Sequence, residues 1–94
     1  MKAASRLAAM CLRITTRRSG QVTVVQIDGQ LRKDGVPELQ RACESIEGPL
    51  CLDLANLQSI DAEGARSIVM LQEHGAAVAG VSPYIDLRLK RATH

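Results

Sequence analysis

The sequence is almost free of aromatic residues. It contains no Phe and no Trp, and its single tyrosine is Tyr84. Proteins that bind single-stranded nucleic acids stack the bases on aromatic side chains, and sugar sites rely on similar contacts. The composition therefore argues against both classes of ligand. Because 46% of the 94 residues are hydrophobic, we expect one folded domain whose core consists of aliphatic side chains.

The sequence also lacks the features of a disulfide-rich or membrane-spanning protein. Its three cysteines, Cys11, Cys43 and Cys51, are an odd number without CxxC spacing, which indicates neither a disulfide framework nor a metal site. We expect Cys43 and Cys51 to be core residues in a protein of the reducing cytoplasm. No stretch approaches the roughly 20 apolar residues of a membrane span. The sequence predicts no direct membrane insertion.

The charges are unevenly distributed along the chain. Residues 1–18 hold five basic residues and no acid, whereas residues 28–73 hold nine acids and four bases. An acidic central region is a poor footprint for nucleic acid. It fits a protein partner that carries a basic patch, although an ordinary solvated surface would look the same.

Hydrophobic periodicity predicts an α/β domain. Apolar residues alternate before and after the short Ser19-Gly20 turn, which favours an antiparallel hairpin, and helical spacing starts at Val36. The predicted elements are strands at 12–17 and 21–28, a loop at 29–35, a helix at 36–46, a strand at 50–54, a loop at 55–61, a helix at 62–74, a strand at 76–81 and a helix at 83–91.

This β-β-α-β-α-β-α order predicts a small mixed β-sheet covered by helices. The strands after the hairpin are expected to be parallel, with right-handed crossovers. The most apolar strand, 50–54, is expected in the interior of the sheet. Residues 12–94 form a single domain in this interpretation, and residues 1–11 form an N-terminal extension whose order is left open.

Two carboxylates and a glycine lie where the predicted loop at 55–61 meets the next helix. A helix N-terminus stabilises an anion because its first amide groups lack intrahelical partners. Asp61 is therefore predicted to cap this helix, which is worth about 1 kcal/mol, and Glu63 to lie in its first turn. Gly64 lets the helix approach neighbouring backbone or a partner. A purely structural role is one interpretation of these residues.

Catalytic and metal-binding interpretations have less support. Carboxylates in acid–base catalysis need a cleft and a third positioned group, and neither His74 nor the terminal His94 has an evident route to the junction. Asp53 could join Asp61 and Glu63 around a divalent cation, but three loosely spaced acids are a weak signal. We predict no enzyme activity, no catalytic residue, no metal and no cofactor.

Three segments together resemble the STAS domain, the fold of anti-sigma factor antagonists that is also found attached to anion transporters and in a lipid-transport complex. The segments are "VVQIDGQL", "LCLDLANLQSIDAEGARSI" and "AGVSP" before the last helix. The middle segment is similar to the core motif of the family: an aliphatic strand, Asp53, a short loop, an aliphatic-Asp pair, two small residues, a glycine and a helix.

The chain departs from the family pattern at two positions. Glu63 occupies the phosphosite-equivalent position before Gly64, where antagonists carry a serine or threonine that a partner kinase phosphorylates. Arg32, in "GQLR", replaces the acidic residue that commonly follows glycine-x-leucine in the family. The chain therefore resembles a short form that lacks the phosphorylatable serine, and phosphorylation at position 63 is not expected.

The resemblance implies a non-enzymatic protein-interaction module in signalling and transcription regulation in a bacterial cytoplasm. Its partner would be an anti-sigma factor-like kinase or another signalling protein. Two alternatives are a soluble accessory subunit of a lipid-transport ATPase and a small nucleotide- or metabolite-binding protein, and homodimer formation is left open. The residues assigned to partner binding are Ser59, Asp61, Ala62, Glu63, Gly64, Arg66 and Ser67, with Arg32 and Asp34 beside them.

Overall fold

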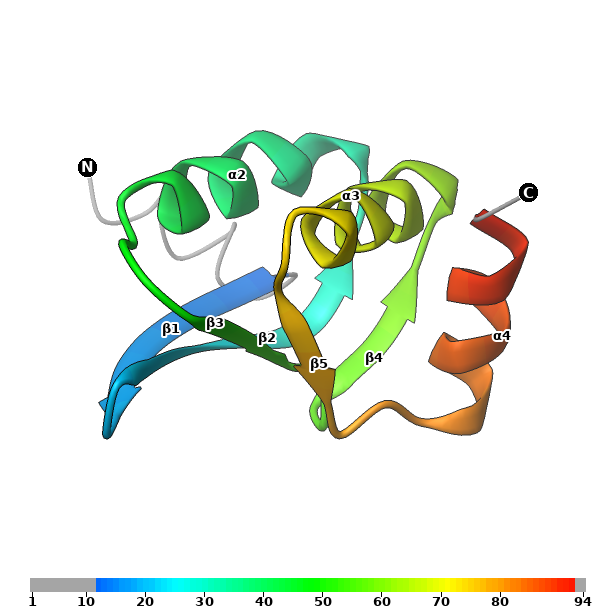
Figure 1. Ribbon diagram of the computed structural model, residues 1–94. Coiled ribbons are helices and arrows are strands. Elements are labelled where there is room, and N and C mark those ends of the chain that lie inside the picture. The colour runs from blue at the N-terminus through cyan, green and yellow to red at the C-terminus, as the bar shows by residue number, and fades with distance from the viewer. Residues whose placement is uncertain (1–11, 93–94) are drawn as a thin grey trace.

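The computed structural model describes residues 12–92, so the predicted extension at 1–11 and His94 lie outside the described part of the chain. Figure 1 shows the sheet with helices on one side. The elements are β1 (Leu12–Ser19), β2 (Val22–Leu31), the short 3₁₀ turn η1 (Lys33–Gly35), α2 (Val36–Glu44), β3 (Leu50–Asp53), β4 (Leu57–Ile60), α3 (Ala62–Glu73), β5 (Ala77–Ala79) and α4 (Pro83–Ala92).

The sheet is organised around β2, its longest strand. β1 pairs with β2 in antiparallel register, and Ser19 lies opposite Val22 across the tight turn that the sequence predicted. The other edge of β2 is shared, because β3 pairs with Thr23–Gln26 and β4 pairs with Gly29–Leu31, both in parallel. β5 continues the sheet beside β3. The predicted mixed sheet and the interior position of β3 are confirmed.

The strand β4 is the element that sequence analysis missed. A loop was predicted at 55–61, but Leu57–Ile60 is a strand in which Leu57 and Ile60 are buried. Four residues are too few for hydrophobic periodicity to separate a strand from a loop with apolar contacts. The strand depends on pairing with the second half of β2, which is far away in sequence. The predicted loop at 29–35 also shortens, because β2 extends to Leu31 and η1 follows.

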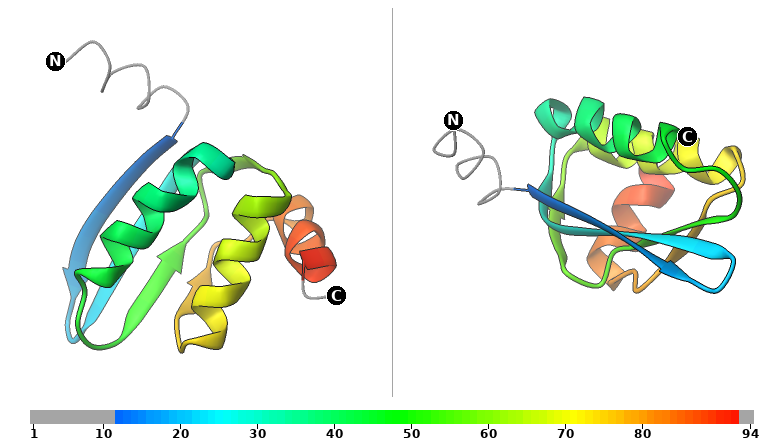
Figure 2. Two further views of the ribbon diagram at one scale, coloured as in Figure 1. Left: turned by 90° about the horizontal axis from the view of Figure 1, so that it is seen from above. Right: turned by 90° about the vertical axis from the view of Figure 1, so that its left-hand side faces the viewer.

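An aliphatic core lies between the sheet and the helices. Figure 2 shows α2 and α3 over one face, with α4 beside α3, and α4 also contacts β4. The side chains with the largest buried volume are Ile27, Leu31, Leu39, Leu52, Leu54, Ile68, Ile85 and Val25. The core is therefore aliphatic, as the lack of Phe and Trp in the sequence predicted. Within residues 12–92, no helix is both long and apolar enough to cross a membrane.

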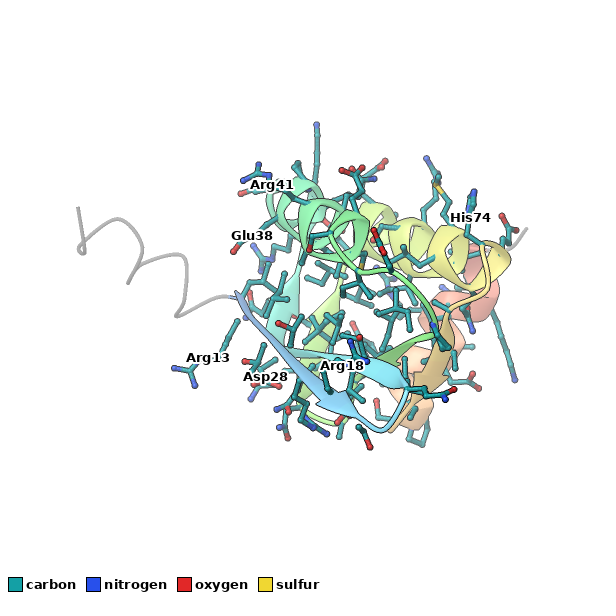
Figure 3. The ribbon with its side chains drawn as sticks, turned by 60° about the vertical axis from the view of Figure 1, so that its left-hand side comes forward. Arg13, Arg18, Asp28, Glu38, Arg41 and His74 are labelled. Atoms are coloured by element: carbon teal, nitrogen blue, oxygen red, sulfur yellow. The ribbon has the colours of Figure 1, made fainter. Side chains whose placement is uncertain are left out.

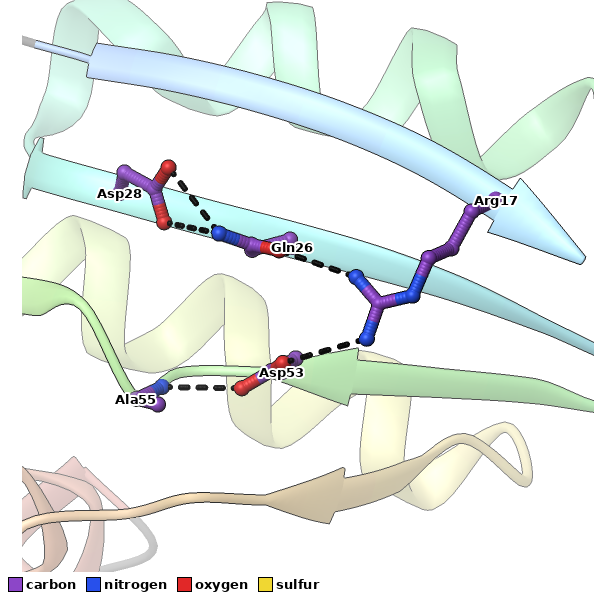
Figure 4. Close-up of polar contacts among 5 residues, drawn as sticks. All are labelled: Arg17, Gln26, Asp28, Asp53 and Ala55. Carbon is purple, nitrogen blue, oxygen red and sulfur yellow. Dashed lines mark hydrogen bonds and ion pairs between the residues drawn. The ribbon is translucent and has the colours of Figure 1, made fainter. Parts of the chain in front are cut away.

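Polar side chains line the opposite face of the sheet. Arg17 donates a hydrogen bond of 2.9 Å to Gln26 and lies 3.7 Å from an oxygen of Asp53, while Gln26 donates to Asp28 at 3.0 Å (Figure 4). Cys51 lies one residue before the inward-facing Leu52 and is only half-buried. The prediction that Cys51 is a core residue is therefore wrong, because side chains alternate between the two faces of a strand.

The ends of the later helices follow the predicted signals. Ser82 accepts a hydrogen bond from the Ile85 amide at 3.2 Å and so caps α4 just before Pro83. After α3, Gly75 adopts a positive φ of 105°, and Ala76 N donates to Leu71 O at 3.0 Å. This hydrogen bond satisfies the Leu71 carbonyl group, which α3 would otherwise leave free at its end.

Gly64 marks the closest approach between α3 and the sheet. A Cβ atom at this position would overlap the carbonyl oxygen of Leu31 and would lie 2.9 Å from Cγ1 of Ile60. Of the two interpretations of Gly64, the structure therefore supports close packing on backbone of the same chain. Only a residue without a side chain allows the first turn of α3 to pack against the end of β2.

Replacing Gly64 with alanine should lower the free energy of unfolding by about 1–3 kcal/mol, the usual cost of overpacking. A loss of stability would be informative because alanine favours helices by about 1 kcal/mol over glycine, so helix propensity alone predicts the opposite change. Urea denaturation measures the difference, and Gln72→Ala, at an exposed position of α3, should change stability by no more than about 0.5 kcal/mol. A stabilised Gly64→Ala variant would show that α3 can move away from β2.

Candidate functional site

The candidate site lies where β2 and β4 end side by side. Because the two strands are parallel, the segments that leave them meet at the same edge of the sheet. The amide of Asp61 donates to the carbonyl oxygen of Leu31 at 3.1 Å. The structure therefore brings Arg32–Asp34 next to the start of α3, as the sequence predicted.

The Asp61 carboxylate joins these two segments. Its Oδ1 accepts from the Gly64 amide at 2.8 Å, which is the predicted helix cap, and its Oδ2 accepts from the Lys33 amide at 2.9 Å. Partial burial favours the protonated acid. The two backbone hydrogen bonds, with Arg32 and Arg88 nearby, outweigh that effect and hold the pKa of Asp61 below its usual value. Asp61 is thus an ionised structural link with both oxygens bound.

Glu63 is exposed in the first turn of α3 and is paired with a neighbour. Its carboxylate lies 3.6 Å from the Arg66 guanidinium, and the two side chains are 51% and 63% exposed. Ion pairs this exposed contribute little to stability. The pairing nevertheless offsets the one negative charge that Glu63 places at position 63.

The residues predicted to bind a partner separate into accessible and inaccessible ones. Ser59 and Asp61 are half-buried. Gly64 and Ser67 are buried, and the Ser67 hydroxyl donates to the Gly64 carbonyl oxygen at 2.7 Å, so their assignment as contact residues is wrong. Both face the packed side of α3, which the linear motif did not reveal. The exposed members of the predicted set are Arg32, Asp34, Ala62, Glu63 and Arg66.

A basic cleft between α3 and α4 borders this site, and sequence analysis did not predict it. The cleft, which we call the arginine cleft, has a volume of about 290 Å³ and is lined by Ala62, Ala65, Arg66, Arg88, Arg91 and Ala92. Arg88 is held in place because its Nε and Nη2 donate to the Ile60 carbonyl oxygen at 3.3 and 3.1 Å. The i, i+3 spacing of Arg88 and Arg91 could have indicated that these two arginines share one face of α4. The presence of Arg66 in the same cleft could not be predicted, because it depends on how α3 and α4 pack.

The geometry does not support a metal site or a catalytic pair at the junction. Asp53 lies opposite Gln26 on β2 and Ile60 lies opposite Leu31, so Asp53 is about 16 Å along the strand from the start of α3. Among residues 12–92, no three His, Cys, Asp or Glu side chains are grouped to hold a metal ion. His74 follows the far end of the 12-residue α3, about 20 Å from Asp61; Figure 3 shows it pointing outward.

A second cleft lies between α2 and α3, at the end of α3 that is remote from Asp61. It has a volume of about 450 Å³, and its lining includes Cys43, Met70, Leu71 and His74. Burial raises the pKa of the Cys43 thiol, so this cysteine is protonated near neutral pH and is a weak nucleophile. The acidic residues of the junction take no part in this cleft.

Comparison with known proteins gives a family and a fold. The model of the family described as "Mlab, STAS domain" matches residues 14–82. An anti-sigma factor antagonist STAS domain from Rhodobacter sphaeroides is 20% identical with a TM-score of 0.58, over 72% of this chain and 83% of that one. A serine-to-glutamate variant of RsbS from Moorella thermoacetica is 17% identical with a TM-score of 0.65, over 87% and 79%. No curated protein matches the sequence.

Asp61→Asn should lower the free energy of unfolding at neutral pH, and this free energy should then depend less on pH under acidic conditions. The asparagine keeps one cap oxygen but cannot accept from Lys33. In the unfolded chain Asp61 titrates near pH 3.9, and its folded pKa is lower, so its contribution is complete above pH ~4 and disappears as the pH falls through the folded value.

Urea denaturation at a series of pH values measures this effect. The difference in free energy of unfolding between the wild type and Asp61→Asn should be constant near neutral pH and should narrow as the pH falls below about 4. Asp34→Asn, in the adjacent η1 turn and exposed, should stay within about 0.5 kcal/mol of the wild type. A gap that does not change with pH would show that the ionised carboxylate does not link the two segments.

Proposed function

Because the chain belongs to the STAS-domain family, we propose that it is a non-enzymatic module that docks a signalling protein at the start of α3. Support for this proposal comes from the family match and from the structural likeness to an anti-sigma factor antagonist, a protein whose name describes binding to another protein. The docking surface consists of Arg32, Asp34, Ala62, Glu63 and Arg66, all exposed, above the half-buried Ser59 and Asp61. We place this activity in a bacterial cytoplasm.

The observation that supports docking at this edge is the way Asp61 fixes its two segments. The η1 turn and the first turn of α3 share one carboxylate through hydrogen bonds of 2.8 and 2.9 Å. Gly64 packs tightly on the end of β2 below them. A surface held in one conformation loses little conformational entropy when a partner binds. The exposed Ala62 adds a small contact residue that leaves room for a partner backbone.

The module is not switched by phosphorylation at position 63 in this proposal. Glu63 has no hydroxyl group to modify. A phosphoserine carries about −1.5 to −2 charges and three acceptor oxygens, whereas Glu63 carries one charge that Arg66 partly offsets at 3.6 Å. The surface therefore remains in one electrostatic state, and partner binding is controlled by concentration or by changes in the partner.

A second candidate function is an accessory subunit of a transporter ATPase. The description of the matching family, "Mlab, STAS domain", favours this candidate because STAS domains also occur in a lipid-transport complex. The docking surface would be the same and the partner would differ. Identification of the partner therefore separates the two functions.

Affinity purification of the tagged protein from its native host, with quantitative mass spectrometry, tests the proposal. Ala62→Glu places a longer, negatively charged side chain in the docking surface and should release the partner. Gln72→Glu makes the same kind of change at an exposed position of α3, about 15 Å further along the helix, and should retain it. A partner released equally by both variants, or by neither, contradicts docking at this surface.

The identity of the captured protein assigns the function. A kinase-like or other signalling protein supports the first candidate, and transporter subunits support the second. Glu63→Ser in the same experiment tests the fixed state. If phosphorylation of Ser at position 63 in that variant changes the amount of captured partner, the position can act as a switch that the wild-type chain has lost. If it does not, the position is not a control point in this protein.

A further inference from the structure

We propose that the arginine cleft between α3 and α4 binds an acidic side chain of the protein partner, while Tyr84 and Leu87 make apolar contacts beside it. This inference rests on the proposed function, since the cleft shares Ala62 and Arg66 with the docking surface. It adds the chemistry of the partner: a segment with carboxylates next to apolar side chains. The sequence had suggested the opposite, a partner with a basic patch, because residues 28–73 are rich in acids.

The chain neutralises the positive charge of the cleft only in part. Arg66 lies 3.6 Å from the Glu63 carboxylate. Arg88 is near enough to the Asp61 carboxylate to help lower the pKa of that acid, but the two side chains form no ion pair. Among residues 12–92, Arg91 has no carboxylate partner. Arg88 gives two N–H groups to the Ile60 carbonyl oxygen, and a guanidinium has five. Three arginines therefore line the cleft, and the N–H groups of Arg88 that do not bind Ile60 remain for a carboxylate.

The dipole of α4 explains only part of this arrangement. A basic residue in the last turn of a helix is stabilised by the dipole, and Lys90 and Arg91 occupy that turn. The dipole does not account for Arg66, which comes from α3 and lines the same cleft. The small side chains of Ala62, Ala65 and Ala92 leave the space into which the arginines reach. Fork-shaped guanidinium groups around such a space suit bidentate binding of a carboxylate.

Apolar residues on α4 indicate that the carboxylate belongs to a protein segment. Positions 84, 87, 88 and 91 follow i, i+3, i+4 and i+7 spacing and share one helix face. Tyr84 is 50% exposed and Leu87 is 52% exposed, and both are among the three exposed large hydrophobic residues of the described chain. Tyrosine and arginine are enriched at the centres of protein interfaces. A free phosphate ion would make no use of Tyr84 or Leu87.

A defined peptide tests the inference without knowledge of the natural partner. The probe is a blocked eight-residue peptide in which pairs of leucine and pairs of glutamate alternate, added to the full-length ¹⁵N-labelled protein. We expect amide chemical-shift changes confined to the neighbourhood of Ala62, Arg66, Leu87 and Arg91, which weaken as salt is raised. The same peptide with glutamine in place of glutamate should cause much smaller changes.

Charge reversal locates the binding site. Arg91→Glu should weaken peptide binding by about tenfold, because an attractive ion pair becomes a repulsive one. Arg41→Glu makes the same exchange on α2, away from the cleft, where Figure 3 shows Arg41 pointing outward, and should change the affinity by less than about twofold. Equal effects of the two variants would show that the peptide responds to net charge, and this would overturn the inference.

Two further outcomes would also overturn it. No shift changes at millimolar peptide would show that the cleft does not bind carboxylates. Inorganic phosphate or anionic phospholipid vesicles that compete fully with the peptide, and bind as tightly, would identify a site for free or lipid phosphate instead of a protein segment.

The experiments distinguish this inference from the proposed function. If Ala62→Glu releases the captured partner and Arg91→Glu does not, the docking surface stands and the acidic partner is wrong. If neither variant affects any captured protein, the proposed function fails, and the peptide titration still decides whether the cleft binds carboxylates.

Discussion

The structure depends on one carboxylate with two backbone partners. Asp61 accepts from the Gly64 amide and from the Lys33 amide, so it joins the start of α3 to the turn that follows β2. Its own amide donates to the carbonyl oxygen of Leu31, which also lies against Gly64. The end of the central strand, the helix start and the η1 turn therefore have a fixed relative position. Asp61 is therefore the helix cap that the sequence predicted, and it also binds the turn after β2, which the sequence did not reveal.

The electrostatic character of that edge differs from the charge of the sequence around it. Counted along the chain, the central region is acidic. In space, Asp61 is bound by backbone amides, Glu63 is paired with Arg66, and Arg88 and Arg91 arrive from α4. Charges that are distant in sequence thus determine what a partner meets. The result is a surface of mixed charge bordered by a basic cleft.

Local signals in the sequence predicted much of the fold. The hairpin turn, the Asp61 and Ser82 caps and the aliphatic core all depend on interactions within a few residues or on composition. The STAS resemblance was confirmed by the family match over residues 14–82. The predictions that failed depend on long-range packing. β4 exists because of its pairing with β2, and Gly64 and Ser67 are buried by the way α3 lies on the sheet.

The division of one edge of β2 between β3 and β4 has a consequence for how the chain acquires its structure. Each parallel pairing joins segments separated by a crossover, so one edge of β2 lacks its partners until the chain has been synthesised as far as β4, whereas β1 can pair with the other edge earlier. Contacts between residues that are far apart in the sequence slow folding, because the intervening chain must first close into a loop, at a cost in entropy, before the contact can stabilise it. Truncated chains that end before β3 would therefore leave this edge of β2 unpaired, and an unpaired strand edge is prone to aggregation.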